Sequence, residues 1–136
     1  MTVTIDDLKP IMSPEVARHV STNTLMRARR RDTAQGLDIA LVGVPMDFTT
    51  YQRAGSRYGP AQAREFSRTM RSGHAVTGVM PFDLCRIADI GDAPVSLLDF
   101  DGTIKSIEEF FGRIVDAGAL PLALGGEHTI SLPTGP

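Results

Sequence analysis

The feature that most constrains the fold is a nearly continuous apolar run, Leu37–Pro45, in which only Asp38 is charged. Polar residues do not alternate with apolar ones along it, as they would in a strand with one face in water. Such a run is typical of a strand that is buried on both faces of a parallel sheet. We expect the strand to end at Pro45, which cannot donate to a sheet ladder.

Two further apolar runs, Leu84–Ile90 and Leu120–Leu124, predict two more strands. A helical pattern stands between each pair of consecutive runs, and the connections are long enough for crossovers. Strands and helices that alternate in this way predict an α/β fold with a parallel sheet and right-handed crossovers. About three strands are expected from this chain.

The first helix is expected to begin at Gly59-Pro60, because proline suits the first helical position. Three of its apolar residues fall on one face: Ala63, Phe66 and Met70. The second helix is expected at 103–117, where apolar residues repeat at spacings of three and four, with Thr103 as its N-cap.

Residues 1–36 are interpreted as an irregular N-terminal arm and residues 37–136 as a partial α/β domain. Within the arm, Ser13 and Pro14 predict a short helix that runs to Val20. A cluster of arginines follows, and no aromatic residues interleave it, so we interpret it as a solvated or subunit-facing segment rather than a nucleic-acid contact. The cluster consists of Arg27, Arg29, Arg30 and Arg31.

The composition excludes several classes of protein. There are 14 Lys and Arg residues against 16 Asp and Glu residues, a net charge of -2, which argues against a dedicated nucleic-acid-binding protein. No apolar run approaches the roughly 20 residues that span a bilayer, and the N-terminal segment lacks the apolar core of a secretory signal. We therefore expect a cytoplasmic protein that binds neither nucleic acid nor membranes.

Polar residues follow each predicted strand, where ligands collect in open parallel sheets. Asp47 follows the first strand, and Asp89 and Asp92 stand at the end of the second. These aspartates are either acid–base or metal-binding groups or ordinary turn residues, and we favour turns. The third strand ends in Gly125-Gly126-Glu127-His128, and a neutral imidazole at a strand end is a common metal ligand or proton-transfer group. His128 is therefore the leading candidate.

A second motif competes with His128. The segment Val95–Thr103 resembles the Asp-x-Asp-Gly-Thr signature of haloacid dehalogenase-like phosphatases, in which Asp99 would be the nucleophile, Asp101 the general acid/base and Mg²⁺ the charge clamp. In that superfamily the motif opens the fold, whereas here 98 residues precede Asp99. The competing interpretation is a loop that leads into the next helix, and we favour it.

Three stretches together resemble the ureohydrolase (arginase/agmatinase) family, and its agmatinase and guanidino-acid hydrolase branch in particular. They are Gly43–Arg64, Ala88–Asp92 and Leu122–Ile130, in the family's order and at family-like spacing. The resemblance implies a three-layer α/β fold, a binuclear Mn²⁺ centre at the strand ends, and a homo-oligomer when complete. It implies that a metal-bridging hydroxide attacks a small guanidino substrate, agmatine or guanidinobutyrate, and releases urea and an amine.

On this resemblance, His128 corresponds to the first metal-ligand histidine, and Glu127 is an acid that supports the centre from nearby. The family's later Asp-Ala-His-x-Asp and Ser-x-Asp-x-Asp motifs, which supply the other ligands, do not occur in this sequence. We therefore expect an N-terminal portion of such an enzyme that is inactive alone, with no catalytic residue assigned and the substrate-binding residues unknown. The phosphatase and a non-catalytic α/β interaction module stay open as alternatives.

Overall fold

A parallel sheet of four strands forms the middle layer of the protein, in the order β1-β3-β2-β4. The computed structural model describes residues 2–11, 16–20 and 23–134. The sheet has one strand more than expected, because two residues of the arm pair with β3. The strands are Arg29–Arg30 (β1), Ile39–Val44 (β2), Ile87–Asp92 (β3) and Leu120–Gly125 (β4).

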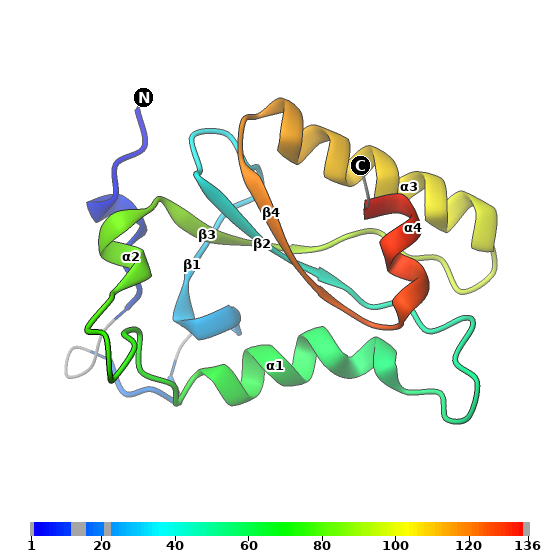
Figure 1. Ribbon diagram of the computed structural model, residues 1–136, viewed down its shortest axis with the longest axis horizontal. Helices are drawn as coiled ribbons and strands as arrows, with labels where there is room; N and C mark the ends of the chain where they lie inside the picture. The colour runs from blue at the N-terminus through cyan, green and yellow to red at the C-terminus, as the bar shows by residue number, and fades with distance from the viewer. Residues whose placement is uncertain (1, 12–15, 21–22, 135–136) are drawn as a thin grey trace.

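Helices lie against both faces of this sheet, as Figure 1 shows, so the predicted three-layer α/β arrangement is confirmed. Helix α1 (Gly59–Ser67) lies against one face and α3 (Phe100–Asp116) against the other. No helix in the described ranges is both long and apolar enough to cross a membrane. The short helices are η1 (Asp6–Leu8), η2 (Leu25–Arg27), η3 (Ser56–Tyr58), α2 (Pro81–Leu84), η4 (His128–Ile130) and α4 (Ser131–Thr134).

The main core lies between the sheet and α3. Ile107, Phe111 and Ile114 project from α3 and pack against the buried side chains of β2 and β3. Leu8 and Ala34, which precede residue 37, belong to the same core. The N-terminal arm therefore packs onto the sheet, and the division of the chain at residue 36 stays a prediction.

Two boundaries differ from the sequence prediction. The strand predicted over Leu84–Ile90 begins only at Ile87, because Pro81–Leu84 forms the short helix α2. The helix predicted to run to Val20 is wrong over residues 16–20, which form bends and turns, while residues 12–15 lie outside the described ranges.

Helix α3 begins earlier than expected and has a different cap. Asp99 is its N-cap and accepts a hydrogen bond from the Gly102 N–H at 2.9 Å. Thr103, predicted as the cap, lies inside the helix and is buried. Its hydroxyl instead donates to the Ser96 carbonyl and accepts from the Ser96 N–H, both at 3.0 Å. Thr103 therefore anchors the preceding loop onto α3.

The face that α1 turns inward is polar, contrary to the hydrophobic pattern. Phe66 is 72% exposed, and Met70, just beyond the helix, is 55% exposed. The buried residues of α1 are Pro60, Arg64 and Ser67. The physical reason is the charged partner on the sheet, since Arg64 pairs with a carboxylate of β3.

Candidate functional site

The carboxyl ends of β2 and β4 lie side by side and form the edge at which His128 was expected. Val44 pairs with Gly125, and the Glu127 N–H donates to the Met46 carbonyl at 2.9 Å. Gly126 has a φ of +67°, and a Cβ there would lie 2.6 Å from the Met46 carbonyl oxygen. Only glycine allows this close approach, which brings the turn after β4 against the loop after β2.

His128 is the first residue of η4 and is exposed at this edge. Within the described ranges, its imidazole makes no hydrogen bond or ion pair, and no group of three or more His, Cys, Asp and Glu side chains could hold a metal ion. The structure thus places His128 at a strand end without further ligands around it. Its role as a metal ligand stays a prediction.

Glu127 contacts the loop after β2. Its carboxylate accepts hydrogen bonds from the Thr49 N–H, with distances of 3.0 and 2.8 Å to its two oxygens, and from the Thr49 hydroxyl at 2.7 Å. The hydroxyls of Thr49 and Thr129 lie 2.6 Å apart. Glu127 and Thr129 flank His128 in the chain, so these bonds tie the turn that carries the imidazole to the loop at Thr49.

Asp47 closes that same loop. Its side chain is buried, and its carboxylate pairs with the Arg57 Nε at 2.7 Å and accepts from the Gly55 N–H at 2.8 Å. The hydrogen bond from the Arg57 guanidinium holds the pKa of Asp47 below its usual range. Asp47 therefore shapes the loop, in agreement with the structural interpretation of this residue.

Asp89 and Asp92 share the guanidinium of Arg64. Asp89, which is fully buried, receives Arg64 Nε at 2.8 Å and Nη2 at 3.1 Å, while Nη1 donates to Asp92 at 2.6 Å. The N–H groups of Leu25 and Gly91 also donate to Asp89, both at 2.8 Å. Burial raises the pKa of Asp89, but the hydrogen bonds from Arg64 and the backbone outweigh it, so the pKa lies below its ordinary value.

Arg64 is the residue that sequence reasoning missed. The ion pair makes Asp89 and Asp92 part of the α1–β3 contact, and this role is neither catalysis nor the simple turn that was favoured. A signal was present, since Pro60, Arg64 and Ser67 follow one another at helical spacings of four and three.

The phosphatase alternative is not supported. Residues 93–99 form no strand, although the signature requires an apolar strand before its first aspartate. Asp99 caps α3, and Asp101 is exposed in the first turn of that helix. The favoured loop interpretation of Asp99 holds, with Asp99 in place of Thr103 as the cap.

The arginine cluster is built into the fold. Arg29 and Arg30 form β1, and Arg30 lies 3.9 Å from Asp89. Arg27 is buried, and it donates to the carbonyls of Ile11 and Met70. The interpretation of the cluster as a solvated or subunit-facing segment is therefore wrong for Arg27, which is buried within the chain.

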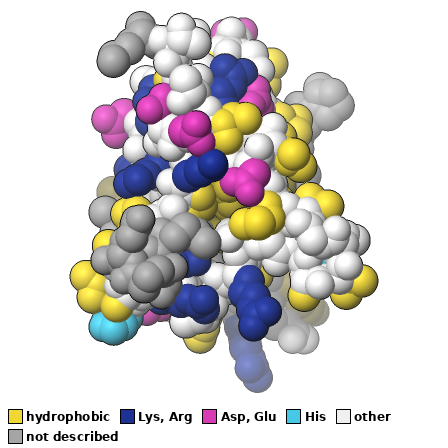
Figure 2. All heavy atoms as spheres, turned by 90° about the vertical axis from the view of Figure 1, so that its left-hand side faces the viewer, with side chains coloured by type: hydrophobic (Ala, Val, Ile, Leu, Met, Phe, Trp, Pro, Cys, Tyr) yellow, Lys and Arg dark blue, Asp and Glu magenta, His cyan; other side chains and the backbone are white. Residues whose placement is uncertain are grey.

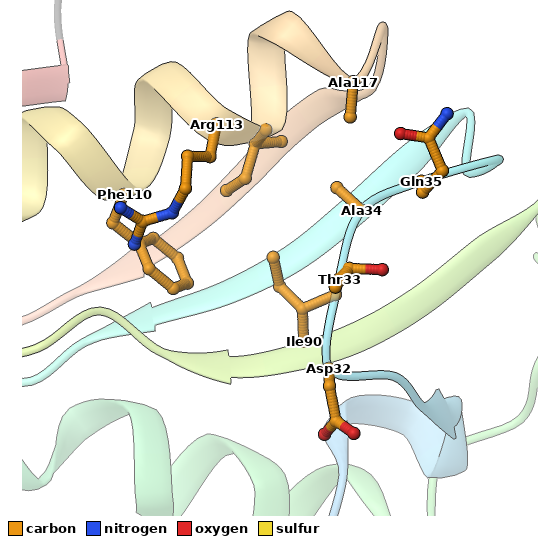
Figure 3. Close-up of a pocket in the computed structure, with 9 residues that line it drawn as sticks. Asp32, Thr33, Ala34, Gln35, Ile90, Phe110, Arg113 and Ala117 are labelled. Atoms are coloured by element: carbon orange, nitrogen blue, oxygen red, sulfur yellow. The ribbon is translucent and has the colours of Figure 1, made fainter.

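A cavity of about 280 Å³ lies between residues 32–35 and α3 (Figure 3). Ile90, Phe110 and Ala117 give it apolar walls, and the Arg113 guanidinium lies 5.6 Å from the centre of the Phe110 ring. Ala117 lies beside the start of β4, so this cavity is remote from the strand ends that carry His128.

Comparisons with known proteins bear on the site. The model of the arginase family matches residues 37–135. The guanidinopropionase of Pseudomonas aeruginosa is 39% identical over 94% of this chain, and the mitochondrial agmatinase of Gallus gallus is 42% identical over 87% of it. The chain spans only 40% and 35% of the lengths of these two relatives.

Solved structures agree with this match. The proclavaminate amidino hydrolase of Streptomyces clavuligerus superposes with a TM-score of 0.82 at 26% identity, over 88% of this chain and 40% of that one. The formiminoglutamase of Trypanosoma cruzi, solved with Mn²⁺, has a TM-score of 0.62 at 26% identity, over 72% of this chain and 33% of that one.

Proposed function

Because this chain belongs to the arginase family, we propose that it forms the N-terminal part of a manganese-dependent hydrolase that cleaves a small guanidino compound to urea and an amine. Guanidinopropionase and agmatinase among its relatives support this substrate class, with agmatine and guanidinobutyrate as the candidates. The observation that supports this proposal most directly is the position of His128. Its imidazole is exposed, has no hydrogen-bond partner in the described ranges, and lies at the strand end predicted for a metal ligand.

The residues present fit one edge of a metal centre. His128 can donate a nitrogen lone pair, whereas Asp47, Asp89 and Asp92 are each engaged by an arginine. A catalytic site needs roughly three or more protein ligands. The remaining ligands would therefore come from outside these 136 residues, and we expect the chain alone to release no urea.

The chain's own residues would position the loop 47–57, which we propose lies near the substrate. A pair of Mn²⁺ ions, when bound, would lower the pKa of a coordinated water and stabilise the charge that develops on the substrate. Glu127 holds Thr49 beside the turn that carries His128, and the Asp47–Arg57 pair keeps this loop closed. Selectivity among guanidino compounds would then depend on the loop 47–57, since loops on a shared scaffold carry specificity.

A cytoplasmic location and a homo-oligomeric complete enzyme belong to the same proposal. The agmatinase of Gallus gallus is a mitochondrial protein. The compartment of the present protein therefore has to be measured in its native cell. Fractionation of that cell and the sedimentation of the complete enzyme test these two points.

The central test is a chimera in which this chain replaces the matching segment of the Pseudomonas guanidinopropionase. We expect the chimera, loaded with Mn²⁺, to release urea from a guanidino acid or agmatine, and the 136-residue chain alone to release none. His128→Ala should lower kcat at least about a hundredfold, the upper range for loss of a supporting group at a metal site. It should also lower the amount of Mn²⁺ that co-purifies.

The matched control is His19→Asn, because His19 is an exposed histidine whose carbonyl accepts from Arg68, just beyond the end of α1 that lies away from β4. It should leave both urea release and the Mn²⁺ content unchanged. If the His128→Ala chimera is as active as the chimera that keeps His128, then His128 is not a ligand of the metal centre. A folded chimera that binds Mn²⁺ but releases no urea from any guanidino compound would favour the non-catalytic interaction module instead.

A further inference from the structure

A cavity of about 490 Å³ opens at the end of the molecule where α1 finishes, opposite the end where β4 runs into α4 (Figure 1). Arg18, Arg27 and Arg71 line it together with His74 and Met80. None of its described lining residues is an aspartate or a glutamate. Among the charged side chains visible in Figure 2, those in the lower half of this face are mainly Lys and Arg, and most of the acidic ones lie above them.

Arg27 places a buried charge in the wall of this cavity. The residue is only 4% exposed. Its Nη1 and Nη2 donate to the carbonyls of Ile11 and Met70 at 3.2 and 3.5 Å, and its Nε is buried without a partner. Among the described residues no carboxylate lies within 4.0 Å of its guanidinium. A buried charge is costly without a counter-charge, and the described residues supply none to Arg27, so a bound anion would stabilise this wall.

The other arginines around the cavity have N–H donors that are unpaired among the described residues. Arg18 donates Nη1 to the Thr69 carbonyl at 3.0 Å, and its other N–H groups make no hydrogen bond within the described ranges. Arg71 is exposed and has no ion pair among the described residues. The His74 Nδ1 accepts from the Thr77 N–H at 3.2 Å. A neutral His74 ring therefore carries its proton on Nε2 and can donate it.

We propose that this cavity binds a small oxyanion, a phosphate-bearing or polycarboxylate molecule, through Arg18, Arg71 and the fixed charge of Arg27. Guanidinium groups suit this class because their N–H donors match the oxygens of phosphates and carboxylates. The volume lies in the range of small-molecule pockets. The site stands apart from His128 and does not depend on the proposed hydrolase activity.

The test is calorimetric titration of the 136-residue chain with inorganic phosphate and, separately, with citrate, at fixed ionic strength and pH 7. We expect saturable one-to-one binding of at least one of the two anions, and the preferred anion identifies the class of ligand. Arg18→Gln and Arg71→Gln should each weaken that binding at least about tenfold, the loss of one charged hydrogen bond. Both side chains are exposed, so these variants should fold normally.

Arg53→Gln is the matched control, because Arg53 is an exposed arginine outside the cavity. It should leave the affinity unchanged. Saturable binding that falls in the two cavity variants but not in the control supports the site. Absence of saturable binding of both anions, or an equal loss in all three variants, overturns it.

Discussion

The two faces of the sheet are covered by helices with opposite chemistry. Against α3 the contact is apolar, and Ile107 and Ile114 are almost completely buried there. Against α1 the contact is ionic, since Arg64 reaches two carboxylates of β3. One face therefore relies on a non-directional hydrophobic contact and the other on hydrogen bonds of defined geometry.

The difference teaches what each face contributes. Apolar packing stabilises the fold in proportion to the area that it removes from water. A buried ion pair contributes little net stability compared with an apolar contact, because desolvation offsets the attraction. The Arg64–Asp89 pair instead fixes positions, because Asp89 joins α1, β3 and the N–H of Leu25 in η2. We infer that the ionic contacts on the α1 side of the sheet fix the positions of α1, β3 and η2 relative to one another.

The largest expected effect comes from breaking the ionic face. Arg64→Met leaves the fully buried Asp89 carboxylate without its guanidinium. We expect the free energy of unfolding in urea, followed by circular dichroism, to fall by about 3–5 kcal/mol, the usual cost of breaking a buried ion pair, because the half-exposed Arg30 at 3.9 Å replaces little of the lost charge.

The double variant Arg64→Met/Asp89→Asn should recover most of this loss, because both charges are then absent. The control Arg53→Met removes an exposed arginine and should change the free energy of unfolding by less than about 0.5 kcal/mol. A loss below about 1 kcal/mol in Arg64→Met would show that Asp89 is not effectively buried, and the contrast between the two faces would disappear.

The next effect comes from the apolar face. Ile107 is fully buried, so Ile107→Ala should lower the free energy of unfolding by about 2–5 kcal/mol through lost burial and a residual cavity. Phe66→Ser removes a larger side chain from α1, yet it should cost less than about 0.5 kcal/mol because Phe66 is 72% exposed. Urea unfolding of both variants checks the order. The reverse order would mean that α1 packs through its apolar residues.

The sequence predicted the α3 face better than the α1 face for a physical reason. The repeat of apolar residues at spacings of three and four is a local signal, and it located α3 correctly within a few residues. The helical spacing around Arg64 indicates which face of α1 is buried, but the partner of Arg64 lies 25 residues further along the chain, and no local pattern reveals which residue it pairs with. Strand β1 was missed similarly, since two arginines become a strand only because the edge of β3 accepts them.

The candidate site shows the same division. The position of His128 at a strand end followed from the apolar run and the glycine pair, and the structure places it there. The bonds between Glu127 and Thr49 join residues 78 positions apart. They depend on β2 and β4 being neighbours, which the order of strands in the sequence does not specify.

The smallest expected effect concerns a more exposed ion pair, Asp38 with Arg86, which links the starts of β2 and β3. Arg86 donates to Asp38 from its backbone N–H at 2.7 Å and its Nε at 3.0 Å, and these bonds lower the pKa of Asp38 to about 2. A carboxyl with a lowered pKa stabilises the fold above its unfolded-state value of 3.8 and loses this contribution as the pH falls towards 2.

Asp38→Asn should therefore lower the free energy of unfolding at pH 7 by less than about 1 kcal/mol. Both side chains of the pair are about a third exposed, so water screens the attraction between their charges. At pH 2 the variant and the parent chain should unfold at nearly the same urea concentration. A difference that stays constant from pH 7 to pH 2 would mean that the lost bonds, and not the charge, carry the effect. Set beside Arg64→Met, the experiment separates burial from charge, because both pairs join Arg to Asp and differ mainly in their contact with water.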